Sequence, residues 1–195
     1  MARLEYVRIS KDKKLLLLGI AEEGERARYT VGEVFYVSIG SPTSGSVIEE
    51  DVLISVKEED QRIRATRKAL SLLSYADNNE RTLKDKLVRA GFSHRVSSNV
   101  AKEMVALGYI DEERQLRRLI IREANVNLSG FSKLLPKLAA KGYSGEQIRS
   151  VTASLVKEGE IDFKANAKKL VEKRLPEGAT YEEKKTLLYK NGYKI

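Results

Sequence analysis

The segment Gly108-Tyr109-Ile110-Asp111 returns 51 residues later as Gly159-Glu160-Ile161-Asp162. A second marker has nearly the same period, because Gly91-Phe92-Ser93, Gly142-Tyr143-Ser144 and Gly192-Tyr193-Lys194 are spaced 51 and 50 residues apart. Two independent markers with one period indicate internal repetition, and each repeat is long enough for about three short helices. The sequence from residue 61 onward therefore predicts a mainly α fold of tandem three-helix repeats.

Glycine marks the ends of the predicted helices. A helix often ends with a glycine in the left-handed conformation, and the next residue then folds back on the last helical turn. A leucine stands four residues before the glycine of each Gly-aromatic marker, so we interpret the three aromatic residues as caps and core rather than base-stacking platforms. Asp111 and Asp162 are predicted N-caps of the helices that follow. Two capping boxes are also expected, at Ser144 with Gln147 and at Thr180 with Glu183.

These boundaries divide the chain into a small N-terminal module and three repeats. Helices are predicted near 62–75, 80–90, 94–107, 112–124, 130–141, 145–158, 163–174 and 180–191. The repeats are expected at 61–111, 112–162 and 163–195, with the third truncated. Short helices cannot bury their apolar faces alone, so we expect the repeats to stack into an elongated, curved helical array.

Residues 1–60 predict a β-hairpin-containing module. Strand-like runs at 4–9, 15–20 and 26–31 are separated by turn clusters at 11–14 and 22–25. The stretch 32–39 is rich in residues that favour strands, but it is short enough to be a helix imposed by tertiary structure. An acidic stretch, 49–60, leads into the first long helix.

The charge of the chain is unevenly distributed and indicates which kind of partner the protein binds. The chain has 195 residues, no cysteine and a net charge of +8. Residues 1–61 carry eight basic and twelve acidic side chains, whereas residues 62–195 carry 28 and 16. This basic block is typical of a protein that binds a polyanion or an acidic protein surface, although solvated helix faces explain it equally well. No targeting or membrane-spanning segment is expected, so we predict a soluble, cytoplasmic protein. We also expect a monomer.

Basic residues recur at helical spacing on four predicted helices. Arg114, Arg118 and Arg122 are four residues apart and share one face, with Arg117 beside them. The other stripes are Arg64, Arg67 and Lys68 in the first helix, Lys133, Lys137 and Lys141 in the fifth, and Lys168, Lys169 and Lys173 in the seventh. Exposed helix surface accounts for any single stripe, but four stripes favour a shared face for carboxylate or phosphate.

The sequence offers no constellation for catalysis. His94 is the only histidine, and without cysteine or a second histidine a conventional zinc site is excluded. The glycines at 40 and 45 are not followed by the Lys-Ser/Thr of a phosphate-binding loop. We therefore expect no enzyme, no metal and no cofactor.

The order and spacing of these features over residues 62–162 resemble the RecX family, the bacterial regulators of the recombinase RecA. The residues that carry the resemblance are Ala69 to Tyr75, Leu83 to Leu87 with Gly91-Phe92, Gly108 to Glu112, Gly130 to Leu134, and Leu138 with Lys141-Gly142. The most specific part is Gly-Tyr-Ile-Asp followed about thirty residues later by Leu-x-x-Lys-Gly. Residues 1–60 resemble, more loosely, a β-hairpin extension of some members.

The resemblance implies a protein that lies in the helical groove of RecA filaments. There it would limit filament growth, ATP turnover, strand exchange and co-protease activity, and so act in homologous recombination, DNA repair and the SOS response. A curved repeat protein with a basic concave face can bridge neighbouring protomers of such a filament. The alternative is a helical-repeat protein that binds single- or double-stranded DNA, or RNA, directly. An aromatic content of 7% with no tryptophan argues mildly against single-strand stacking.

Overall fold

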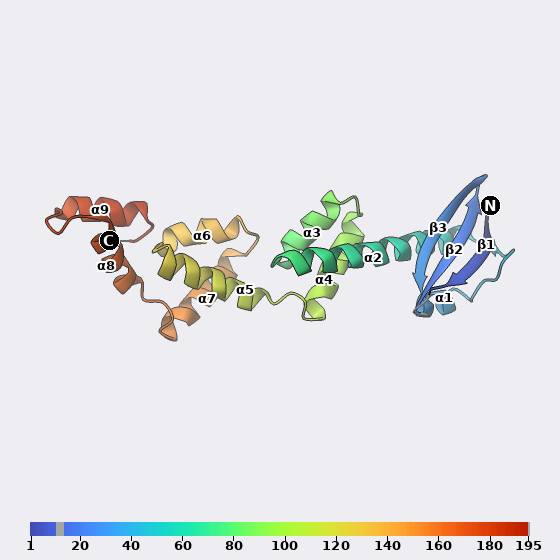
Figure 1. Ribbon diagram of the computed structural model, residues 1–195, viewed down its shortest axis with the longest axis horizontal. Coiled ribbons are helices and arrows are strands. Elements are labelled where there is room, and N and C mark those ends of the chain that lie inside the picture. The colour runs from blue at the N-terminus through green and yellow to red at the C-terminus, as the bar shows by residue number, and fades with distance from the viewer. Residues whose placement is uncertain (11–13, 195) are drawn as a thin grey trace. The chain divides into compact units, whose positions relative to one another are not determined.

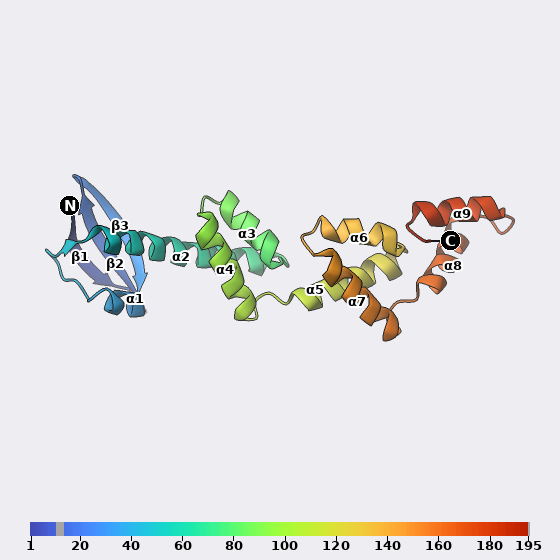
Figure 2. The same cartoon turned by 180° about the vertical axis from the view of Figure 1, so that it is seen from behind.

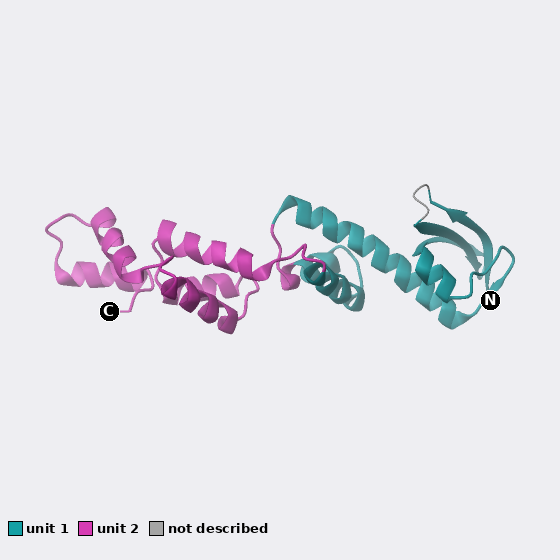
Figure 3. Cartoon of the chain, turned by 90° about the horizontal axis from the view of Figure 1, so that it is seen from below, with its two compact units in different colours: residues 1–76, 83–106 teal, residues 77–82, 107–195 magenta. Residues whose placement is uncertain are grey.

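The computed structural model describes residues 1–10 and 14–194, which divide into two compact units. Residues 1–76 and 83–106 form the first unit, while residues 77–82 and the chain from residue 107 onward form the second (Figure 3). The chain is mainly helical and carries a small antiparallel sheet near its N-terminus, as predicted. In the described residues no helix is both long and apolar enough to span a membrane.

The sheet has the strand order β3-β2-β1-β4. Its strands are β1 (Ala2–Ile9), β2 (Leu15–Glu22), β3 (Glu25–Gly32) and β4 (Val47–Ile48). The first three confirm the predicted strand runs, and β2 and β3 pair along their whole length. Glu23 and Gly24 join them with φ of 52° and 89°, as a type I′ hairpin turn requires. Residues 11–13 of the other predicted turn lie outside the described residues.

Tertiary packing decides two elements that local propensity leaves open. The stretch after β3 is the helix α1 (Glu33–Ser38), whose Phe35 and Tyr36 pack against the core of the sheet. The next helix, α2 (Glu50–Tyr75), begins twelve residues before the expected start at residue 62. Its first turns cover the sheet (Figure 1). Leu53 and Val56 of these turns are buried in the sheet's core. Burial of these side chains makes the acidic stretch helical.

Carboxylates of α2 occupy the outer edge of β3. Asp60 accepts a hydrogen bond of 2.8 Å from the backbone N–H of Thr30, and Glu59 accepts one of 3.4 Å from the N–H of Gly32. An edge strand exposes unpaired N–H groups that can pair with another chain. In this protein a helix of the same unit satisfies two of them, at the end of β3.

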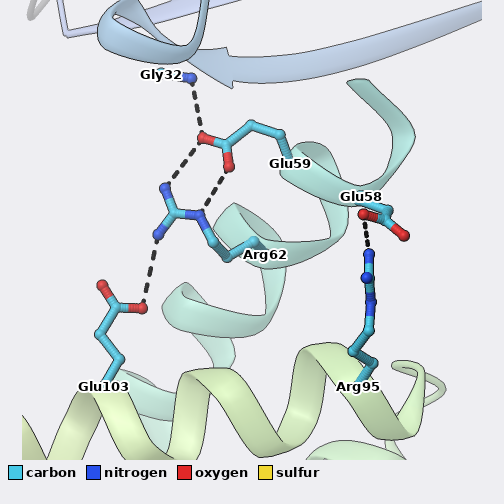
Figure 4. A network of polar contacts seen from close by, with 6 residues as sticks. All are labelled: Gly32, Glu58, Glu59, Arg62, Arg95 and Glu103. Atoms are coloured by element: carbon cyan, nitrogen blue, oxygen red, sulfur yellow. Dashed lines mark hydrogen bonds and ion pairs between the residues drawn. The ribbon is translucent and has the colours of Figure 1, made fainter. Parts of the chain in front are cut away.

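Ion pairs then join α2 to α4 (His94–Ala106). The guanidinium of Arg62 binds Glu59 at 2.8 Å and reaches Glu103 of α4 at 3.6 Å. Near the start of α4, Arg95 pairs with Glu58 of α2 (Figure 4). One network therefore connects the β3 edge, α2 and α4.

The remaining helices lie close to their predicted ranges. They are α3 (Glu80–Arg89), α5 (Glu112–Ile121), α6 (Phe131–Ala139), α7 (Gly145–Lys157), α8 (Phe163–Arg174) and α9 (Tyr181–Lys190) (Figure 2). A π-helical turn, Arg122–Val126, follows α5 directly. In the second unit, α5, α6 and α7 enclose one apolar core, and α8 and α9 enclose a smaller one that includes Leu128.

The predicted helix ends are confirmed. Gly91, Gly142 and Gly192 have φ of 92°, 99° and 83°. In each case the N–H of the aromatic residue that follows binds the carbonyl of the leucine four residues before the glycine, at 3.0 to 3.4 Å. Asp111 and Asp162 cap α5 and α8, and both predicted capping boxes are present at α7 and α9. Tyr143 and Tyr193 are buried, as expected for caps that join the core.

The end of α9 lies directly on the start of α6. The N–H of Gly130 donates to the carbonyl of Asn191 at 2.8 Å, and the N–H of Ser132 donates to that of Gly192 at 3.1 Å. A Cβ on Gly192 would lie 2.4 Å from the backbone nitrogen of Lys133. This junction is therefore closed to any larger residue.

Replacing Gly192 with alanine should destabilise the second unit. The substitution forces a side chain into positive φ and into the α6 backbone, which together should cost about 3 kcal/mol in the free energy of unfolding. Gly159→Ala is the matched control, because Gly159 has φ of 78° with open space around it, and should cost about 1 kcal/mol. Urea unfolding of both full-length variants measures the difference. Equal losses would show that the junction is not tightly packed.

Candidate functional site

The predicted basic stripes lie on α2, α5, α6 and α8. All of their side chains are exposed except Arg117, which is partly buried. The stripes of α5, α6 and α8 belong to the second unit, and that of α2 to the first. Exposure alone does not distinguish a binding residue from a structural one, so the contacts of each side chain matter.

Two arginines of α5 bind within the second unit. Arg117 forms a two-pronged ion pair with Glu158 at the end of α7, and Arg118 binds Asp77 at 2.6 Å. The hydrogen bond from Arg117, followed by one from Ser154, holds the pKa of the Glu158 carboxyl below its ordinary value. Both arginines therefore stabilise the packing of α5 against segments 41 residues away in sequence.

Lys137 on α6 neutralises a buried carboxylate. Its ammonium lies 2.6 Å from Oε2 of Glu123, whose side chain is only 9% exposed. Burial by itself raises the pKa of Glu123, but hydrogen bonds from Lys137 and Asn127, with the charges of Lys137 and Arg122, outweigh it and lower the pKa. Lys137 thus ties α6 to the π-helical turn after α5.

Lys137→Met should destabilise the protein at neutral pH, because it leaves Glu123 buried without its cation. We expect a loss of about 1 to 2 kcal/mol, less than for a fully buried pair because Lys137 is 48% exposed. In the wild type the pKa of Glu123 is below its ordinary 4.5, so the stabilisation from this carboxylate is lost only as the pH falls through that lower value. Without Lys137, burial raises the pKa of Glu123, so this carboxylate takes up a proton at a higher pH than in the wild type.

The deficit of the variant should therefore shrink as the pH falls from neutral toward 4.5. Urea unfolding of both proteins at several pH values measures it. The double variant Glu123→Gln/Lys137→Met removes the unpaired charge and should recover part of the lost stability. A deficit that stays constant with pH would show that the Lys137 charge does not control Glu123.

Three other stripe residues make weaker internal contacts. Lys133 donates to the side chain of Asn191 at 3.0 Å, Arg64 lies 3.5 Å from Asp60, and Lys168 lies 4.0 Å from Glu172. Within the described residues, the other side chains of the set form no hydrogen bond or ion pair. These are Arg67, Lys68, Arg114, Arg122, Lys141, Lys169 and Lys173. Their charges are available for a partner.

Sequence reasoning missed a further basic group on α9 and just after it. Lys185, Lys190 and Lys194 line a surface groove together with Lys133 of α6. The pattern of α9 was interpreted only through its capping box, although its lysines are visible in the sequence. Because the fourth lysine comes from a helix fifty residues earlier, only the fold brings the group together.

The described residues hold no cluster of three or more histidine, aspartate or glutamate side chains suited to a metal ion. His94 is exposed at the first position of α4.

Known proteins resemble this chain in sequence and in fold. No family model matches it. The regulatory protein RecX of Clostridioides difficile (strain 630) is 25% identical over 173 residues, which cover 85% of this chain and 79% of the relative. A crystal structure of regulatory protein RecX matches with a TM-score of 0.72 and 19% identity, over 100% of this chain and 95% of that one. A crystal structure of RecX from Lactobacillus salivarius matches with a TM-score of 0.57 and 17% identity, over 69% of this chain and 90% of that one.

The predicted family resemblance is confirmed: this chain is similar to the RecX regulatory proteins over most of its sequence and through its whole fold.

Proposed function

We propose that this chain is a RecX-type regulator that binds RecA filaments and restrains RecA. It acts by binding rather than by catalysis, in the cytoplasm and as a monomer. It lowers ATP turnover, strand exchange and co-protease activity, and so limits recombination and the SOS response. The similarity to RecX proteins over 85% of the chain supports the class of protein.

The observation that carries the proposal is the pair Arg114 and Arg122. Both are exposed and form no ion pair in the described part of the chain. Arg114 lies in the first turn of α5, and Arg122 begins the π-helical turn that follows α5. Arginine side chains present planar donors that suit carboxylates of a protein partner. The unpaired side chains of α2 and α8 extend the same chemistry, with Lys141 just past α6.

We further propose that the helices work as tandem three-helix repeats, with the boundaries predicted from the sequence. A feature of the second unit supports this view. The side chain of Asn79, next to the first residue of α3, donates to the carbonyl of Lys141 at 2.9 Å. Gly130, 51 residues after Asn79, binds the carbonyl of Asn191 in the corresponding place. A repeated junction favours a repeated unit.

RecA-catalysed ATP hydrolysis on single-stranded DNA tests the function. With this protein added well below the concentration of RecA, we expect inhibition, because a few bound molecules can stop growth of a long filament. The measurement is the hydrolysis rate at near-physiological salt. No inhibition at any ratio would contradict the proposal. Inhibition only once the protein coats free DNA would favour the alternative of direct nucleic-acid binding.

Reversing the two unpaired charges of α5 should weaken inhibition. We expect Arg114→Glu/Arg122→Glu to need about tenfold more protein for half-inhibition, because like charges then meet across the interface. Arg28→Glu/Arg89→Glu is the matched control, since both arginines are exposed, form no ion pair in the described residues, and lie outside the stripes. Equal loss in both variants would mean that net charge, rather than the α5 face, governs binding.

A further inference from the structure

The groove between α6 and α9 has a volume of about 1050 Å³ and a basic lining. Ser132 and Lys133 line it from the first turn of α6. Lys185, Tyr189 and Lys190 line it from α9, followed by Lys194. Glu182 is the one acidic residue in the lining. The groove therefore holds an excess of positive charge at a site that none of the predicted stripes defines.

Aromatic side chains alternate with lysine along one face of α9. Tyr181, Lys185 and Tyr189 are four residues apart, so they lie in a row on the helix surface. The ammonium of Lys185 lies 5.9 Å from the centre of the Tyr181 ring. The two tyrosines are 65% and 79% exposed, and their positions differ by about 12 Å along the helix axis.

No structural role accounts for this exposure. Tyr143 and Tyr193 are buried caps of helix ends, whereas Tyr189 lies within α9 with most of its ring in solvent. Lys133 is held by Asn191 at 3.0 Å, so its ammonium is positioned at the groove while keeping two donors for another group. Exposed aromatic rings beside lysines are the combination that binds single-stranded nucleic acid, because the lysines contact the phosphates and the rings stack on the bases.

We propose that this groove binds single-stranded nucleic acid. The lysines contact successive phosphates, and Tyr189 stacks on an unpaired base at the rim. The site is separate from the α5 surface assigned to RecA, and the proposal does not depend on that assignment. A duplex fits less well, because its bases are already stacked and cannot reach the tyrosine.

Fluorescence anisotropy with a short labelled oligothymidylate, and with oligouridylate, tests the charge component without RecA present. For Lys185→Gln/Lys190→Gln we expect about tenfold weaker binding, and a slope of log affinity against log salt reduced by about 1.4 for the two lost phosphate contacts. Lys102→Gln/Lys157→Gln removes the same charge from exposed positions on α4 and α7 and should bind like the wild type. Binding of either strand supports the proposal, and binding of neither overturns it.

Tyr189 tests the stacking component. Tyr189→Leu should weaken binding by about fivefold or more, the effect of losing one base–aromatic contact, whereas Tyr189→Phe should bind as the wild type does. Because Tyr189 is mostly exposed, both variants should keep the urea midpoint of the wild type. The proposal is overturned if duplex DNA binds as tightly as the single strand, or if the leucine variant binds normally.

Discussion

Two backbone hydrogen bonds, from Gly130 to Asn191 and from Ser132 to Gly192, hold the last helix pair on the start of α6. The first N–H groups of a helix have no hydrogen-bond partner inside that helix. At the start of α6, the carbonyls of Asn191 and Gly192 accept hydrogen bonds from two of these groups. The contact is so close that a Cβ on Gly130 would lie 2.3 Å from the carbonyl oxygen of Gly192. The groove beside α9 exists because these backbones meet, since they place Lys133 next to the α9 lysines.

A similar contact between a helix start and a helix end occurs where α3 begins. Asn79 binds the carbonyl of Lys141, and its side chain lies 3.1 Å from the place of a Cβ on Gly142. In one junction a side-chain amide makes the contact, and in the other the backbone does. A glycine that ends one helix is therefore both a cap and the surface on which another helix start rests.

Charge serves two purposes along the basic stripes. Arg117, Arg118 and Lys137 neutralise acidic groups and fasten α5, α6 and α7, and for these residues loss of charge is first a loss of packing. Arg114 and Arg122, on the same helix and its continuation, form no hydrogen bond or ion pair among the described residues, although the charge of Arg122 helps to lower the pKa of Glu123. A helix surface can thus carry structural and partner-directed cations three or four residues apart.

Local features of the sequence determined where the helices of residues 80–190 begin and end. A cap involves residues within four or five positions of each other, so Gly91, Asp111 and the capping box at Ser144 could be identified without the fold. Only the tertiary structure decided that α2 begins at Glu50 and that α1 is helical, because burial against the sheet overrides weak local preference. It also decided which cations are free, because an ion pair such as Arg118 with Asp77 joins residues 41 apart and leaves no local pattern in the sequence.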